Sequence, residues 1–224
     1  MFVGHLALAL AGKKIRPATS LAWLMAAVCL VDLIWPVFML AGIEHARVDP
    51  GNTAFTPLAF DSYPWTHSLL MGIVWAVAFA ALARAFGVSA SGAGLIGVLV
   101  VSHWVLDLIT HRPDLPIWPT TGAAVYGLGL WHSITGTFVV EGALWVVGIM
   151  MFLRARRPLK AVARVAFWSF VLLSTFIWIS GPFSPPPPDE RSLALFALIG
   201  WITIPWAWWI ERTSTTRPPA HGQG

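Results

Sequence analysis

The stretch Pro17–Ile43, PATSLAWLMAAVCLVDLIWPVFMLAGI, contains a single charged residue, Asp32. A transmembrane helix needs about 20 predominantly apolar residues, so this stretch is long enough to cross a bilayer. An aspartate at the centre of such a helix costs about 2.5 to 3.5 kcal/mol, so Asp32 needs a specific partner or a function. We therefore expect a membrane span that carries a functional carboxylate.

Five further stretches have the same apolar character and predict spans at residues 64–86, 95–110, 134–153, 161–180 and 193–210. Residues 2–11 are apolar but too few to span, which predicts a half-helix packed against the rest of the protein. Only 11% of the residues are charged, against about 25% in soluble domains. The sequence thus predicts an all-α integral membrane bundle of about six transmembrane helices with a short N-terminal half-helix. It would form one domain over residues 1–211, followed by a disordered tail at 212–224.

The net charge of +4 reflects membrane topology rather than nucleic-acid binding, because the basic residues lie at the ends of the apolar stretches. Alternating the spans places eleven of them on one side: Lys13, Lys14, Arg16, Arg84, Arg154, Arg156, Arg157, Lys160, Arg164, Arg212 and Arg217. Only Arg47, Arg112 and Arg191 fall on the other. The positive-inside rule then predicts a cytoplasmic C-terminus, and we expect the membrane to be a bacterial inner membrane.

Histidines and carboxylates gather toward the opposite, outer side of the membrane. They are His5, Asp32, His67, His103, Asp107, His111, His132 and Glu141, with Glu44 and His45 in the adjoining loop. His103, Asp107 and His111 recur every four residues, so they line one helix face. At least four segments supply such groups at one depth, which favours a metal site over isolated hydrogen bonds between helices. The single cysteine, Cys29, leaves only imidazole and carboxylate ligands for an ion.

Two other interpretations use the same residues. A transporter would employ them as a transit site, and a non-catalytic scaffold would employ them to hold helices together. A transporter needs a polar path to the cytoplasmic side, whereas the inner half of each predicted span is almost purely apolar. This asymmetry favours an enzyme over a conduit.

Several motifs resemble those of the membrane-bound metal-dependent hydrolases, an inner-membrane group. They are Gly4-His5 followed by Lys13-Lys14, Asp32 late in a span, Thr66-His67-Ser68-Leu69-Leu70, and Ser102-His103 with Asp107 four residues on. The ordered set covers about the first half of the chain. The chain departs from the family pattern at Asp61–Trp65, where many members have His-Arg-Gly, and at His132, where an asparagine is common.

The resemblance and the converging side chains together imply a metal-dependent hydrolase that acts on a phosphoester or a lipid. The expected ligands of a divalent ion, with zinc favoured, are His5, Asp32, His67, His103 and Asp107. The candidates for a general base are Glu141, His111 and Glu44, which the sequence does not rank. Arg112 and His132 are the candidates for holding an anionic group of the substrate. The expected partners are membrane lipids and a small-molecule or lipid substrate, not nucleic acid.

Overall fold

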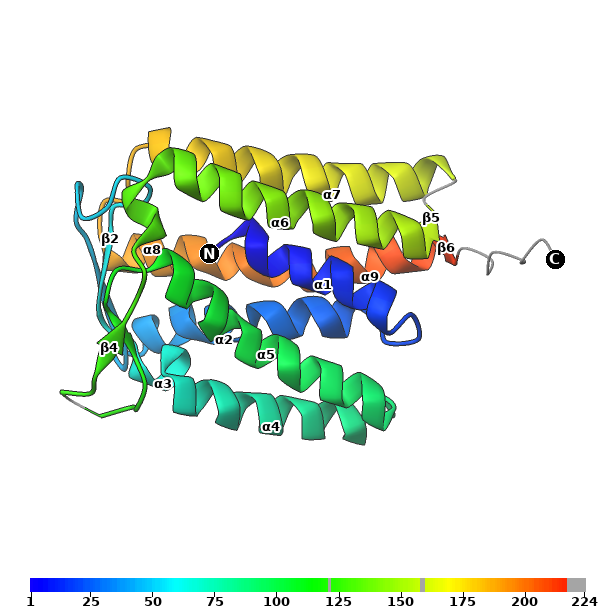
Figure 1. Cartoon of the computed structure of the whole chain (residues 1–224), viewed down its shortest axis with the longest axis horizontal. Helices are drawn as coiled ribbons and strands as arrows, with labels where there is room; N and C mark the ends of the chain where they lie inside the picture. The colour runs from blue at the N-terminus through cyan, green and yellow to red at the C-terminus, as the bar shows by residue number, and fades with distance from the viewer. Residues whose placement is uncertain (121, 158–159, 217–224) are drawn as a thin grey trace.

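The computed structural model describes residues 1–120, 122–157 and 160–216, which form an all-α bundle (Figure 1). Five of the described helical segments are long and apolar enough to cross a membrane: α2 (Leu21–Leu40), α5 (Ala90–Thr110), α6 (Ile134–Ala155), α7 (Ala161–Ser180) with the short turn after it, and the segment Glu190–Thr213. A sixth apolar helix, α4 (Leu69–Ala85), has 17 residues. The predicted all-α membrane bundle is therefore confirmed.

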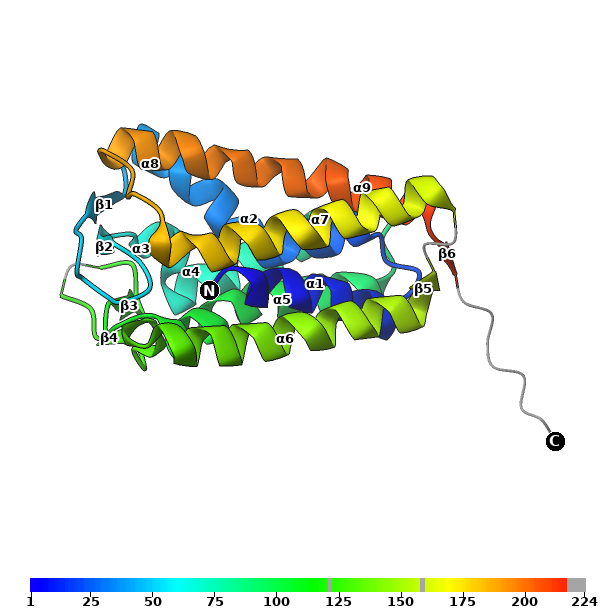
Figure 2. The same cartoon turned by 90° about the horizontal axis from the view of Figure 1, so that it is seen from above.

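The N-terminal helix α1 (Val3–Ile15) lies within the bundle rather than on its surface (Figures 1 and 2). Its 13 residues measure about 20 Å, less than the hydrocarbon thickness of about 30 Å, in keeping with a half-helix. It continues past the predicted end at Ala11 to Ile15, so that Lys13 and Lys14 form its last turn. The chain thus begins near the middle of the bundle.

The predicted start of the third span at Leu95 was wrong, because α5 begins five residues earlier, at Ala90. The Ser89 side chain accepts a hydrogen bond from the backbone N–H of Gly92 at 3.2 Å, which caps the helix. A serine at this position satisfies one of the unpaired N–H groups of a first turn, and glycines that follow it do not prevent a helix. The glycine-containing residues 90–94, which lie before the predicted span 95–110, therefore form the start of α5.

The last span is built from α8 (Glu190–Ala197), the 3-10 turn η3 (Leu198–Ile202) and α9 (Thr203–Thr213). It extends beyond Ile210 because the Glu211 carboxylate accepts hydrogen bonds from the Ser20 hydroxyl at 2.8 Å and the Leu21 N–H at 2.9 Å, and pairs with Lys13.

Residues 212–216 are therefore not the start of a disordered tail. After α9, β6 (Thr215–Thr216) pairs with β5 (Arg156–Arg157). The remainder of the predicted tail, 217–224, with Arg217 and His221, lies outside the described residues.

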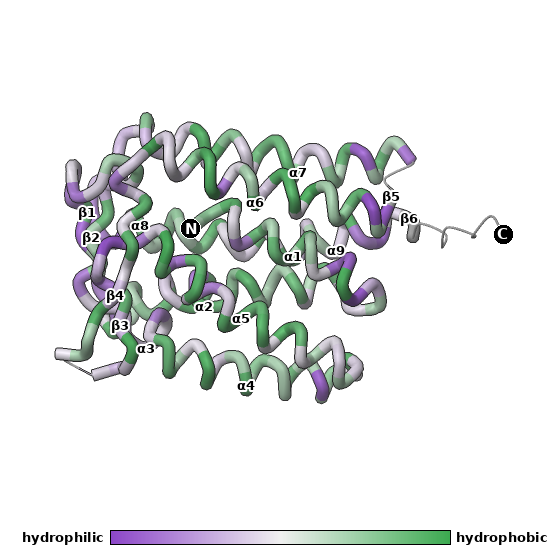
Figure 3. The backbone as a smooth tube through the Cα atoms, viewed as in Figure 1, coloured by the Kyte–Doolittle hydropathy of each residue, from purple (hydrophilic) through white to green (hydrophobic). Residues whose placement is uncertain are grey.

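The two ends of the bundle differ in construction. One end, here named the loop end, holds the hairpin of β1 (His45–Val48) and β2 (Leu58–Ser62), the pair β3 (Leu115–Pro116) and β4 (Val125–Tyr126), and the short helical turns α3 (Pro64–His67), η1 (Leu130–His132) and η2 (Gly181–Phe183). The other, the basic end, holds the final turns of α1, α4, α6 and α9 (Figure 1). Hydrophilic residues concentrate at both ends, with apolar helices between them (Figure 3).

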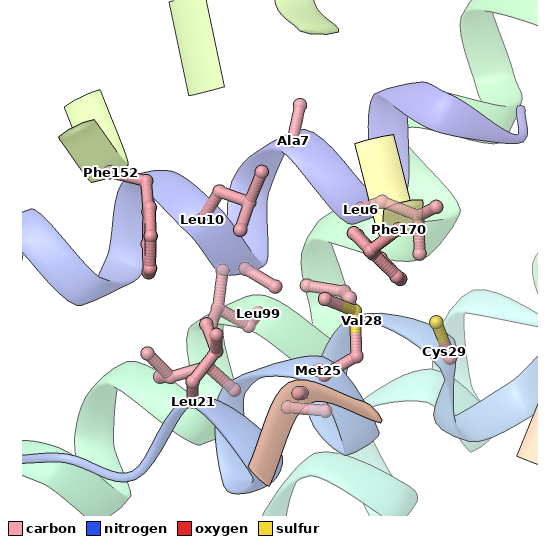
Figure 4. Close-up of a cluster of buried hydrophobic side chains, with 14 of the residues drawn as sticks. Leu6, Ala7, Leu10, Leu21, Met25, Val28, Cys29, Leu99, Phe152 and Phe170 are labelled. Carbon is pink, nitrogen blue, oxygen red and sulfur yellow. The ribbon is translucent and has the colours of Figure 1, made fainter. Parts of the chain in front are cut away.

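The main core fills the space between α1 and its neighbours. Figure 4 shows Leu6 and Leu10 of α1 among side chains from α2, α5, α6 and α7. Phe152 and Phe167 stack with ring centroids 4.9 Å apart, closing this core toward the basic end. These apolar side chains lie between the two polar ends of the described chain.

Gly148 on α6 allows α1 to approach closely. A Cβ atom at this position would lie 2.5 Å from the carbonyl oxygen of Ala7 and 2.7 Å from its Cα. We expect Gly148→Ala to lower the free energy of unfolding by about 1–3 kcal/mol, as overpacking does elsewhere. Gly94→Ala is the control, since no atom lies within 4 Å of its Cβ position. Thermal unfolding in detergent measures both, and equal midpoints would contradict the close packing.

Candidate metal centre

Five side chains from four helices meet near the loop end of the bundle: His5 of α1, Asp32 of α2, His67 of α3, and His103 and Asp107 of α5. They form two overlapping groups of three, and within each group one ligand atom per residue lies within 4.8 Å of the others. The closed group is His5, His103 and Asp107, and the open group is Asp32, His67 and His103. All five residues expected as ligands therefore lie together, with His103 common to both groups.

The closed group is sealed inside the protein. Nε2 of His5 lies 3.0 Å from Oδ1 of Asp107, and Nε2 of His103 lies 3.0 Å from Oδ2 of the same carboxylate. The two imidazole rings stack with centroids 3.7 Å apart and planes 4° from parallel. The amino group of Met1 also contacts Asp107. This carboxylate thus already has a cationic partner on its closed side.

The open group differs in its access. Oδ1 of Asp32 lies 3.3 Å from Nε2 of His67 and 3.5 Å from Nε2 of His103. Both imidazoles are buried, whereas the Asp32 side chain is 46% exposed. A small molecule can therefore reach the cluster on the side where the Asp32 carboxylate is exposed.

The protonation of His103 follows from its partners. Its Nδ1 lies 2.7 Å from the carbonyl oxygen of Val28, and a carbonyl only accepts, so Nδ1 carries a proton. In the neutral ring Nε2 then presents a lone pair. This atom is buried without a hydrogen bond, although carboxylate oxygens of Asp107 and Asp32 lie nearby. An unpaired buried atom facing two anions requires a cation, either an added proton or a metal ion.

His67 is oriented by a chain of two further residues. The Thr66 hydroxyl lies 2.7 Å from Oε2 of Glu44 and 2.7 Å from Nδ1 of His67. A hydroxyl has one proton, and a carboxylate only accepts, so Thr66 donates to Glu44 and accepts from Nδ1. Nε2 of His67 therefore presents its lone pair toward Asp32. A histidine held through its other nitrogen in this way is typical of metal ligands.

Glu44 was a candidate general base, and the structure places it behind His67 instead of at the open face. Its Oε1 accepts the N–H groups of Trp65 at 2.7 Å and Thr66 at 2.8 Å, in addition to the hydroxyl bond at Oε2. The carboxylate is fully buried. With these three donors it anchors the first turn of α3, which carries His67.

Glu141, the second candidate base, holds the start of α1. Its Oε2 accepts the N–H groups of Phe2 at 2.9 Å and Gly4 at 3.3 Å, and Oε1 is buried without a partner. The first N–H groups of a helix lack partners within it, so a carboxylate there stabilises the helix. His5 follows directly after Gly4, so Glu141 fixes the position of that imidazole.

His111, the third candidate base, caps α5 and lies beside the cluster. Its Nε2 lies 3.9 Å from Oδ2 of Asp107, and its Nδ1 lies 2.9 Å from Oδ1 of Asp114. The same oxygen of Asp114 accepts a hydrogen bond from the Tyr63 hydroxyl at 2.9 Å. Burial lowers the pKa of His111 below its ordinary value. The pKa of Tyr63 is raised, mainly by burial and to a lesser extent by the negative charge of Asp114. His111 is therefore neutral near pH 7, with its proton on Nδ1 and Nε2 free to accept one.

The two candidate anion-binding residues lie at the loop end. Arg112 is partly exposed and its Nε donates to Oδ2 of Asp114 at 3.3 Å. His132 is exposed and ends η1. Both can contact a group that approaches from outside the bundle.

The sequence pattern did not identify Thr66 and the carbonyl of Val28 as groups that orient the cluster. Thr66 stands next to His67, and a hydroxyl beside a histidine was a usable signal. The carbonyl of Val28 has no such signal, because every residue has one.

No protein-family description, curated protein or solved structure matches this chain. The resemblance to membrane-bound hydrolases stays a prediction.

We predict that Glu141→Ala destabilises the protein by about 1–3 kcal/mol, because the N–H groups of Phe2 and Gly4 lose their buried acceptor. Glu141→Gln keeps a carbonyl acceptor of the same size and should lose much less. Unfolding in detergent, followed by near-UV circular dichroism, measures both variants. Equal losses in the two would contradict the capping role and point to the charge instead.

Proposed function

We propose that this chain is a membrane-embedded metal-dependent hydrolase that acts on a phosphoester or lipid substrate. In this proposal Asp32, His67 and His103 hold a divalent ion, with zinc favoured, and Asp107 and His5 complete the cluster on its closed side. The observation that carries it is the buried Nε2 of His103, which lies 3.0 Å from Oδ2 of Asp107 and 3.5 Å from Oδ1 of Asp32, so that a cation is needed among these three atoms.

The donor set fits a catalytic ion. Zinc in enzymes is bound by three protein ligands from histidine and carboxylate side chains, with one position left open. Asp32, His67 and His103 supply that combination, and both imidazoles have their remaining nitrogen held by an acceptor. The exposed side of Asp32 supports access at the open position.

When bound, such an ion polarises an ester or phosphoryl oxygen and makes water acidic enough to react near neutral pH. The protein's own groups supply the rest. His111 can accept a proton at Nε2, because its Nδ1 donates to Asp114. Arg112 and His132 can bind an anionic group of the substrate at the loop end. Glu44 and Glu141 act by positioning His67 and His5.

The distribution of polar groups supports an enzyme rather than a transporter. Between the cluster and the basic end lie buried apolar side chains such as Leu10, Leu24 and Phe152. Lys13 and Glu211, at the basic end, are paired with each other. We propose that the cluster faces the extracytoplasmic side of a bacterial inner membrane and that the C-terminus is cytoplasmic. The loop end carries Arg47, Arg112 and Arg191, whereas the basic end carries most of the basic residues, and basic residues favour the cytoplasmic side.

Elemental analysis of purified protein tests the ion directly. We expect stoichiometric metal in the wild type and its loss in His67→Ala and Asp32→Ala. His45→Ala is the matched control, since His45 is an exposed histidine whose Nδ1 lies 3.2 Å from Oε1 of Glu190, away from the cluster. Retained metal in both site variants, with all proteins monodisperse in size-exclusion chromatography, would reject the site. No metal in the wild type, with reduced stability of the variants, would favour the scaffold interpretation.

Turnover of a panel of phosphoesters and lipids, measured beside metal flux in proteoliposomes, separates the enzyme from a transporter. We expect turnover in the wild type that depends on the ion and is lost in His67→Ala. Flux without turnover would reject the hydrolase.

The orientation of His67 gives a further prediction. Thr66→Val keeps the shape of the side chain but removes the hydroxyl between Glu44 and His67, so we expect metal affinity to fall by about 10- to 100-fold. Thr66→Ser keeps the hydroxyl and should bind the ion nearly as well as the wild type. Competition with a chromophoric chelator measures both affinities. Wild-type affinity in the valine variant would show that this chain of contacts does not support the site.

A further inference from the structure

A small gap lies inside the protein beside the candidate metal centre, between α2, α3, α4 and α5. Its volume is about 10 Å³, which is close to the minimum that holds one water molecule. Its lining includes His67 and His103, two of the three ligands proposed for the ion, whose Nε2 atoms lie 3.3 and 3.5 Å from the same oxygen of Asp32. The other lining residues are Val31, Thr66, Ser68, Gly72, Val100 and Trp104. The gap therefore adjoins the proposed ion site.

Gly72 of α4 borders unoccupied space. The residue is buried, yet no atom lies within 4 Å of the position that a Cβ atom would take. At Gly148, by contrast, the same position is only 2.5 Å from the carbonyl oxygen of Ala7. Because Gly72 is part of the gap's lining, an added methyl group would occupy the gap without meeting a protein atom.

Ser68 brings an unused hydrogen-bond donor to the gap. Its side chain is fully buried, and its oxygen accepts the N–H of Met71 at 3.3 Å, which caps α4. A hydroxyl group has one proton besides its acceptor positions. Within residues 1–120, 122–157 and 160–216 no acceptor is present for the proton of Ser68. A buried donor without a partner is costly, so this hydroxyl favours an acceptor inside the gap.

Thr66 supplies the complementary acceptor. Its oxygen donates to Glu44 and accepts from Nδ1 of His67, which leaves one lone pair unused. A water molecule in the gap can therefore accept from Ser68 and donate to Thr66, and a buried water needs two to four such polar partners. The gap also lies at the first turn of α4, where the helix dipole favours negative charge. That charge develops on the oxygen of a water molecule that loses a proton.

We propose that the gap holds the water molecule that the hydrolase consumes, with Ser68 as the residue that positions it. The inference rests on the proposed function. The water is enclosed, because Thr66, Ser68 and His103 are all buried, whereas a substrate arrives where the Asp32 side chain is exposed. The two reactants thus do not compete for one entrance. Ser68 keeps its own proton and forms no bond to the substrate.

Two variants test the site in opposite ways. Ser68→Ala removes the donor, and Gly72→Ala fills the gap with a methyl group. Ser89→Ala is the matched control for the first, since Ser89 caps α5 in the same way through the N–H of Gly92. Gly94→Ala is the control for the second, since Gly94 is an exposed helical glycine whose Cβ position is equally unobstructed.

Crystal structures that show ordered water are the first readout, for protein with and without its metal. We expect one water in the gap of the wild type and of both controls, within hydrogen-bond distance of the Ser68 hydroxyl. We expect none in Ser68→Ala or Gly72→Ala. An empty gap in the wild type, or a water retained in both variants, would overturn the proposal.

The split between kcat and KM is the second readout. For a phosphoester that the wild type hydrolyses, we expect kcat to fall about tenfold in Ser68→Ala and Gly72→Ala, equivalent to about 1.4 kcal/mol, with KM unchanged. Both controls should keep the wild-type kcat. Gly72→Ala should unfold at no lower temperature than the wild type, because alanine favours a helix over glycine. Its loss of turnover would therefore not reflect a loss of folding.

The failure of this inference and that of the proposed function have different signatures. Metal-dependent turnover in the wild type, with an equal kcat in Ser68→Ala and Gly72→Ala, would overturn the inference and leave the hydrolase standing. If no protein has turnover but the ordered water follows the substitutions, the hydrolase and the reacting role of the water fail together, while the water site stands.

Discussion

The buried Nε2 of His103 is the constraint on which the rest of the site depends. Val28 holds the proton of this ring on Nδ1, so Nε2 turns a lone pair toward the carboxylates of Asp107 and Asp32. Anions and a lone pair cannot be buried together without a compensating positive charge, because the low dielectric strengthens their repulsion. A proton on Nε2 relieves it, and so does a divalent ion with the donor types it prefers, to which the exposed side chain of Asp32 gives access.

The bundle is organised to bring α1 into this arrangement. A helix too short to span would be costly in lipid, and here it is enclosed by longer helices. Gly148 of α6 lets its backbone approach, and Glu141 of the same helix binds its first N–H groups. At the other end Lys13 pairs with Glu211 of α9. Together these contacts fix the position of α1 along the bundle, and therefore the position of His5 beside His103.

Much of this could be predicted from the sequence because the membrane imposes simple rules. Apolar length identified the spans, and the spacing of four between His103 and Asp107 placed both on one face of α5. The start of α5 was missed because Ser89 caps a glycine-rich turn that looks like a loop. The sequence did not predict that residues 212–216 are structured, because their structure depends on contacts of Glu211 across the bundle and on strand pairing with residues 156–157. The Val28 carbonyl and the Glu44–Thr66 link have no pattern in sequence, since they arise from tertiary packing.

X-ray absorption spectroscopy of the purified protein, at the edge of whichever metal it contains, tests the central claim most directly. The account predicts a stoichiometric ion with nitrogen and oxygen ligands at about 2.0–2.2 Å, and the outer-shell scattering of at least two imidazole rings. Replacing His103 by alanine should remove one ring or the whole ion. An ion without imidazole scattering, or protein that contains no metal after purification without chelators and after reloading, would contradict it.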